Sequence, residues 1–127
     1  MAKHRQERVS REVLRILSTA LLEDAKDPRL LDVTITDVSV SSDLSVASVR
    51  WLCPNGVDRT EIAKGLEAAT PYLRSVIGDE MDLRRVPSLR FYYDDAYEKG
   101  LQMDALLARL RANGEMGSDE DKANEEA

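Results

Sequence analysis

A proline interrupts an otherwise helical stretch in the middle of this chain, and it limits the folds that the chain can adopt. Residues 61–69 read EIAKGLEAA, and Thr70-Pro71 is followed at once by YLRSVIG. Proline cannot donate the helical hydrogen bond, and its ring clashes with the preceding turn. Thr70 can instead cap a second helix that begins at Pro71. The pattern therefore predicts two helices joined by a sharp kink without a loop, the second ending near Gly78.

Residues 5–24 have the spacing of an amphipathic helix, with apolar side chains recurring on one side. Four arginines follow the other side, and they are Arg5, Arg8, Arg11 and Arg15. A solvated charged face is the simplest interpretation of such a run. Arginine also suits phosphate, because its guanidinium group donates forked hydrogen bonds. The stripe is therefore a candidate phosphate contact, which Lys3 and His4 extend.

Two runs rich in β-branched residues follow the first helix. Asp27-Pro28-Arg29 ends that helix, and residues 30–42 predict a strand. The apolar alternation of this strand changes parity between Ile35 and Val38, which indicates a β-bulge near Asp37. Residues 47–53 predict a second strand after a short link, so the two strands should form an antiparallel hairpin.

The remaining segments predict a helix, a strand and a last helix. Asp58 and Glu61 resemble a capping box at the start of the kinked helical segment, and residues 88–94 alternate as a third strand. Asp95 and Glu98 repeat the capping pattern before a last helix. That helix is expected to pack through four leucines, which are Leu101, Leu106, Leu107 and Leu110.

This order of elements predicts an α+β fold, a three-stranded sheet with helices packed on one face. A helix and two strands followed by two helices and a strand is the arrangement of a KH domain of the bacterial type. KH domains clamp a nucleic-acid backbone at a GXXG loop between two helices, and no GXXG sequence stands between the helices here.

The formal net charge of −6 is concentrated at the C-terminal end. Residues 112–127 hold six acids and one lysine, so the rest of the chain is nearly neutral. A segment so poor in apolar residues cannot offset its ordering entropy by burial. We therefore expect a folded domain over residues 1–111 and a disordered acidic tail over 112–127. Any nucleic-acid binding must rest on local basic patches.

Other features bear on location and on chemistry. The chain has no apolar run of membrane-spanning length, a polar N-terminal stretch and a single cysteine, Cys53, which together favour a cytoplasmic protein. Asp94 and Asp95 could act as paired acids, but adjacent acids also end a strand and cap a helix. His4 is the one histidine, which argues against a zinc cluster or a catalytic triad. Tyr92, on one strand face with Arg90, is a candidate base contact.

The ordered motifs of the chain resemble those of the ribosome-binding factor A family, bacterial assembly factors of the small ribosomal subunit. In chain order they are Arg8-Val9, Asp27-Pro28-Arg29, VTITDVSVSSDLSVASV, LEAATPYLRSVIG, LRRVPSLRFYYDD and Leu106-Leu107. Each motif alone is weak, and their common order over about residues 5–110 makes the resemblance specific.

The resemblance implies a type II KH fold in which a kink between two helices replaces the GXXG loop. The kink residues would be Ala68, Ala69, Thr70 and Pro71. Thr70 stands where the family usually has glycine, and Pro71 would supply the bend by its own means.

The resemblance further implies a noncatalytic factor without a cofactor. It would bind the immature 30S subunit near the 5′ helix of 16S rRNA and stabilise one RNA arrangement during maturation, notably in the cold. Nothing in the sequence demands more than a monomer. The expected RNA-binding residues are Arg5, Arg8, Arg11, Arg15, Arg74, Arg84 and Arg85. A generic single-stranded RNA-binding KH module and a small enzyme that uses Asp94 and Asp95 are the alternatives.

Overall fold

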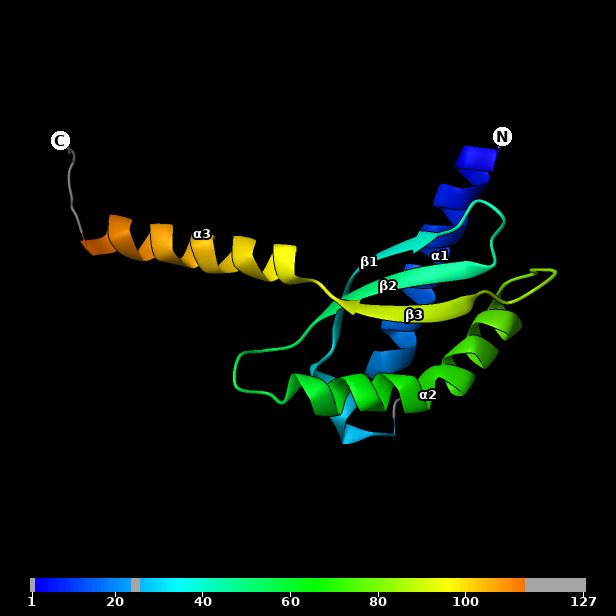
Figure 1. The fold of residues 1–127 in the computed structure, drawn as a ribbon, viewed down its shortest axis with the longest axis horizontal. Coiled ribbons are helices and arrows are strands. Elements are labelled where there is room, and N and C mark those ends of the chain that lie inside the picture. The colour runs from blue at the N-terminus through cyan, green and yellow to red at the C-terminus, as the bar shows by residue number, and fades with distance from the viewer. Residues whose placement is uncertain (1, 24–25, 114–127) are drawn as a thin grey trace. The chain divides into compact units, whose positions relative to one another are not determined.

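The computed structural model describes residues 2–23 and 26–113, which form two compact units that divide after Asp94. The elements are α1 (Ala2–Glu23), a short 3-10 helix η1 (Pro28–Asp32), β1 (Thr34–Val40), β2 (Val46–Leu52), α2 (Arg59–Glu80), β3 (Ser88–Tyr93) and α3 (Asp95–Asn113) (Figure 1). The predicted α+β class and order of strands and helices are confirmed. None of the described helices is long and apolar enough to cross a membrane.

The three strands form one mixed sheet in the order β1-β2-β3, with β1 antiparallel and β3 parallel to β2. The predicted hairpin is therefore confirmed. The register shifts between Ile35 and Asp37, which confirms the predicted bulge. Because the extra residue restores the alternation, Ile35 opposite Trp51 and Val38 opposite Val49 face the same side of the sheet.

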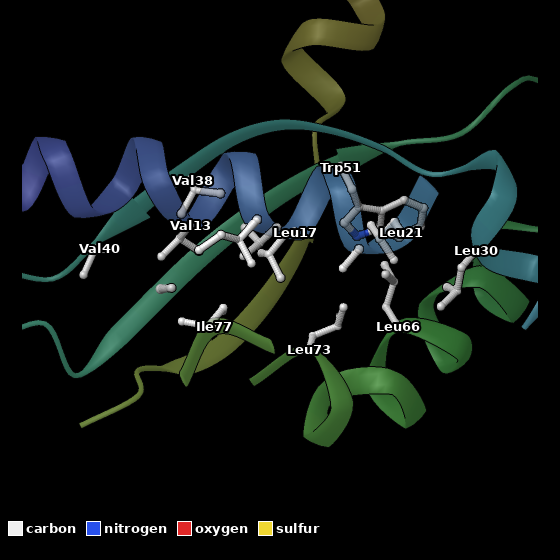
Figure 2. Packing of buried hydrophobic residues seen from close by; sticks show 14 of the residues in the cluster. Val13, Leu17, Leu21, Leu30, Val38, Val40, Trp51, Leu66, Leu73 and Ile77 are labelled. Carbon is white, nitrogen blue, oxygen red and sulfur yellow. The ribbon is translucent and has the colours of Figure 1, made fainter. Parts of the chain in front are cut away.

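The hydrophobic core lies between the inner face of the sheet and the helices α1 and α2. It includes Leu21 of α1, Trp51 of β2 and Leu66 of α2, each at most 3% exposed. Figure 2 shows these side chains directed toward one another from their three elements. Trp51 also meets the Tyr93 ring edge to face, with ring centroids 5.0 Å apart. Burial on one side of each element explains why both helices cover the same face.

Helix α2 runs without interruption through Pro71, so the prediction of two separate helices capped at Thr70 is wrong. The Thr70 hydroxyl donates to the carbonyl oxygen of Leu66 at 3.0 Å instead of accepting from the next turn. Helical backbone is kept because Leu66 and Leu73, before and after the proline, are both buried. The predicted bend is present, and Figure 1 shows α2 changing direction along its length.

The C-terminal end of α2 also differs from the prediction. Gly78 lies inside the helix, which continues to Glu80 and ends at Met81, whose N–H donates to Ile77. A Cβ at Gly78 would lie 3.1 Å from a methyl carbon of Val86. Glycine is therefore used here for close approach of the segment that precedes β3, and not for a left-handed cap.

Residues 30–32, predicted as strand, belong to η1 instead. The carboxylate of Asp27 caps η1 by accepting from the Arg29 N–H at 3.0 Å, and it also binds the Arg29 guanidinium group at 2.6 Å. These hydrogen bonds hold the pKa of Asp27 below its usual value. Arg29 reaches Glu61 of α2 at 3.4 Å, so the Asp-Pro-Arg motif links η1 to α2.

The β1–β2 turn is held by side chains. Leu44 has a φ of 62°, in the left-handed region that costs a leucine roughly 1 kcal/mol. The Asp43 carboxylate offsets this strain by accepting from Ser45 Oγ at 2.7 Å, Ser41 Oγ at 2.8 Å and the Ser45 N–H at 3.1 Å. These bonds, that from Ser45 Oγ foremost, lower the pKa of Asp43 to about 2.

We expect the stability that this turn provides to depend on pH. Since the pKa of Asp43 in the folded chain lies below its ordinary 3.8, the ionised group stabilises the fold above that value. The benefit is lost as pH falls toward about 2. The Tm of Asp43→Asn should therefore lie below that of the wild type near neutral pH, and the gap should close between about pH 4 and pH 2. A gap that stays constant in thermal melts across this range would contradict the assignment.

Helix α3 is the described part of the second unit, and the expected packing of its leucines stays a prediction. Leu101, Leu106, Leu107 and Leu110 are 38–57% exposed, and no residue of α3 is buried. Among the described residues of this unit, 95–113 form a single helix. Of the predicted acidic tail, residues 112 and 113 end α3, and 114–127 lie outside the described residues.

Candidate nucleic-acid interface

Three of the seven predicted RNA-binding arginines gather at one end of the sheet. Arg5 of α1 and Arg84 and Arg85, which precede β3, line an open hollow of about 500 Å³ beside the β1–β2 turn. All three are exposed. The fold thus brings together cations that are about 80 residues apart in the chain. Guanidinium groups that converge on a hollow can bind the phosphates of a folded RNA.

Asp43 lines the same hollow. Its carboxylate accepts hydrogen bonds from the hydroxyl groups of the turn residues Ser41 and Ser45, which are uncharged donors. Three arginines and one acid leave the lining positively charged, so an anion is favoured there.

The other arginines of the α1 stripe lie in different surroundings. Arg8 is exposed, and Arg11 lines a second hollow between α1 and β1. Beside this hollow, Gln6 Nε2 donates to the Val40 carbonyl at 2.7 Å, and the Val40 N–H donates to Ser10 Oγ at 3.0 Å. These bonds attach α1 to β1, and Glu7 and Asp37 line the same hollow as Arg11. The RNA contacts of Arg8 and Arg11 stay predictions.

Arg15 forms ion pairs within the protein. It binds Glu12 at 2.9 Å and Glu80, at the end of α2, at 3.5 Å. The hydrogen bond between Arg15 and Glu12 raises the pKa of the arginine and lowers that of the glutamate. Since all three side chains remain about half exposed, the pairs are weak in water. Arg15 therefore connects α1 and α2, and its RNA contact stays a prediction.

Arg74 holds the segment that carries the basic pair. Its Nε donates to the Pro87 carbonyl at 3.1 Å and its Nη2 to the Val86 carbonyl at 2.9 Å. These carbonyls directly follow Arg84 and Arg85 in the chain. Arg74 therefore positions the cations of the hollow, whether or not it also reaches RNA.

We expect Arg74→Met to lower the free energy of unfolding by about 1–2 kcal/mol, because two hydrogen bonds from a charged donor are lost. Thermal melts of Arg74→Met would measure this loss. The control is Arg109→Met, which changes an exposed arginine of α3. The salt dependence of RNA binding is a second readout, since loss of one phosphate contact reduces the logarithmic slope by about one. An unchanged Tm would contradict the positioning role.

The part of α2 around Pro71 borders a third hollow, also of about 500 Å³. Of the predicted kink residues, Ala68 and Ala69 line it, together with Tyr72, and α1 and η1 supply the opposite side. Alanine and leucine side chains dominate this lining, and Lys26 and Asp27 are its charged residues. Such a lining suits an apolar group or a base better than a phosphate.

Asp94 and Asp95 stand where β3 passes into α3. The Asp94 carboxylate accepts from the Thr36 hydroxyl at 2.6 Å, and the Asp94 N–H donates to the Trp51 carbonyl at 2.8 Å. Asp95 begins α3. Within residues 2–23 and 26–113, no three histidine, cysteine or acidic side chains gather so as to hold a metal ion. Asp94 thus has a structural role in joining β1 to the end of β3.

Sequence reasoning missed Arg50 and Arg59. The Arg50 guanidinium lies 5.7 Å from the centre of the Tyr92 ring, and that of Arg59 lies 3.7 Å from the centre of the Tyr93 ring. Both are cation–π contacts across elements. The alternation of β2 in the sequence indicates that Arg50 faces outward. That Tyr92 lies beside it depends on the register between β2 and β3, which the sequence does not show.

A three-stranded α+β domain with arginines gathered beside its sheet offers a positively charged surface to an anionic partner. Residues 5–107 match the family model of ribosome-binding factor A. A curated ribosome-binding factor A of Clostridioides difficile is 36% identical over 119 residues, which are 92% of this chain and 94% of the relative. The chain therefore belongs to the ribosome-binding factor A family.

Solved structures agree with this assignment. A crystal structure of ribosome-binding factor A from Thermus thermophilus is similar with a TM-score of 0.62 at 25% identity, covering 69% of this chain and 94% of that one. An NMR structure of a Thermotoga maritima ribosome-binding factor A gives 0.61 at 28% identity, covering 69% and 85%. A Thermus thermophilus homology model fitted into the cryo-EM map of a 30S complex gives 0.51 at 29% identity, covering 66% and 93%.

Proposed function

We propose that this chain is a noncatalytic maturation factor of the 30S ribosomal subunit. It binds the immature subunit near the 5′ helix of 16S rRNA and supports rRNA processing and late assembly, notably in the cold. The observation that carries this proposal is the gathering of Arg5, Arg84 and Arg85 at one hollow in a chain of this family. The relative fitted into a 30S complex lends further support.

The proposed mechanism is a shift of population among RNA arrangements. A protein that contacts one arrangement better than another stabilises the first by the difference in binding free energy, without making or breaking a bond. Arginine contacts to phosphate set the position of the protein on the RNA and make binding sensitive to salt. The bent α2 takes the place of the GXXG loop of a KH domain and holds Arg74 against the segment of the basic pair. The factor acts as a cytoplasmic monomer.

Deletion of the gene tests the proposal in cells. We expect gradient profiles to show excess free 30S particles, with precursor sequence kept at the 5′ end of 16S rRNA, and a stronger defect at low temperature. A plasmid copy of the wild-type gene is the control and should restore the profile. Mature 16S ends and a normal profile in the deletion strain would count against the function.

An in vitro competition separates this function from generic binding of single-stranded RNA. The full chain should prefer 30S particles over an unstructured oligonucleotide of equal concentration in nucleotides. Equal affinity for both would favour the generic KH module.

A further inference from the structure

The face of the sheet opposite α1 and α2 carries a polar and aromatic surface within the first unit. Its outward positions alternate with the core residues along all three strands. They include Asp37, Ser39, Ser48, Arg50, Ser88, Arg90 and Tyr92, with Val46 at the start of β2. Tyr92 is 43% exposed, although its neighbours Phe91 and Tyr93 pack against the core. We call this surface the outer sheet face.

The strand register places two cations around the exposed ring. Arg50 lies directly opposite Tyr92 in the parallel pair of β2 and β3, with its guanidinium carbon 5.7 Å from the ring centre. Arg90 lies two residues before Tyr92 on the same strand and opposite Ser48. The ring therefore has one arginine beside it on the neighbouring strand. A second arginine lies two residues earlier on its own strand and on the same face.

Small residues surround this group. Ser39 pairs with Ser48, and Ser88 begins β3, so the part of the face between the ring and the β1–β2 turn carries small side chains beside Arg90. Asp37 lies opposite Arg50 and is the one acid among these strand positions, while Asp94, directly after β3, binds the Thr36 hydroxyl at 2.6 Å. Arg50 and Arg90 therefore concentrate positive charge beside the ring.

We propose that the outer sheet face binds single-stranded RNA, with one base stacked on Tyr92 and the adjacent phosphates held by Arg50 and Arg90. Aromatic rings stack on bases of any sequence, and guanidinium groups pair with the phosphates beside them. Charge complementarity favours nucleic acid, because the face offers cations, serines and a single ring. A protein partner would need a larger apolar centre. The inference rests on the proposed RNA-binding function and adds a second contact to it.

The outer sheet face continues from the basic hollow. The Ser88 N–H donates to the Ser45 carbonyl at 2.9 Å, which joins the start of β3 to the turn that lines the hollow. Tyr92 lies four residues along β3, or roughly 13 Å at the rise of a strand. One RNA strand can therefore contact Arg84 and Arg85 in the hollow and then Tyr92 on the sheet.

Substitution of Tyr92 in the full chain tests the platform. We expect Tyr92→Ala to weaken binding to purified 30S particles about tenfold, because the stacked base loses its partner. Tyr92→Phe keeps the ring and should stay within about twofold of the wild type. Tyr97→Ala, which removes an exposed tyrosine of α3, is the matched control. Thermal melts of all three confirm folding, since Tyr92 lies outside the core.

Photocrosslinking identifies the class of partner. Irradiation of the full chain with 30S particles containing 4-thiouridine should attach a nucleotide to the peptide that contains Tyr92. Crosslinks that fall only on other peptides of the chain, or a Tyr92→Ala variant with wild-type affinity, would overturn the inference. If Tyr92→Ala binds normally while changes at Arg84 and Arg85 weaken binding, the platform fails and the proposed function stands. Failure of the wild-type chain to bind 30S particles would overturn both.

Discussion

Replacing Arg84 and Arg85 together by glutamate should weaken binding of the full chain to 30S particles by about 100-fold at moderate salt. Each charge reversal removes a charge-assisted contact to phosphate and adds repulsion. Together these lower the binding free energy by roughly 1–1.5 kcal/mol per exposed site. Both side chains lie at the hollow that also holds Arg5. Because two phosphate contacts are lost, the slope of the logarithm of affinity against the logarithm of salt should fall by roughly two. Sedimentation with 30S particles at several salt concentrations measures both quantities.

A matched control separates local contact from net charge. Arg109→Glu with Arg111→Glu makes the same change in charge on α3, where both side chains are exposed. If the hollow binds RNA, this control keeps most of the affinity. Equal losses in the two double variants would mean that overall charge governs binding and that the hollow is not a specific contact. Unaltered Tm values in both variants would show that folding is intact.

The features of the fold that could be predicted from the sequence are those with a local cause. The change of parity between Ile35 and Val38 predicted the bulge correctly, because a strand with one buried face needs an extra residue to restore its alternation. Pro71 predicted a bend, and α2 changes direction along its length (Figure 1). The continuity of α2 was missed, since it depends on the Thr70 hydroxyl and on burial of Leu73 by other elements.

The surroundings of the arginines could not be predicted in the same way. A pattern of charges shows that Arg15 and Arg74 are cations, but not that Glu80 and the Val86 carbonyl lie beside them. Those neighbours are distant in the sequence and are set by the packing of helices on the sheet. The parallel pairing of β2 with β3 likewise decides that Arg50 stands next to Tyr92. Residue type therefore predicts the chemistry available, and tertiary register decides which groups act together.

Leu66→Ala should be the most destabilising of the changes considered, with a loss of about 3 kcal/mol in the free energy of unfolding. Leu66 is fully buried between α2 and the sheet, so truncation leaves a cavity in addition to the lost burial. For a unit of this size the loss corresponds to a fall in Tm of roughly 15 °C. Differential scanning calorimetry or denaturant titration would measure it.

The same substitution on α3 provides the comparison, because Leu110 is 57% exposed. Leu110→Ala should change the free energy of unfolding by less than about 0.5 kcal/mol. Well below its melting temperature, Leu66→Ala should still bind 30S particles, since Leu66 supports the bent helix but lies away from the arginines of the hollow. Loss of binding by the folded variant would mean that the packing of α2 adjusts the RNA-binding surface directly. A small loss of stability at Leu66, equal to that at Leu110, would contradict the assignment of Leu66 to the core.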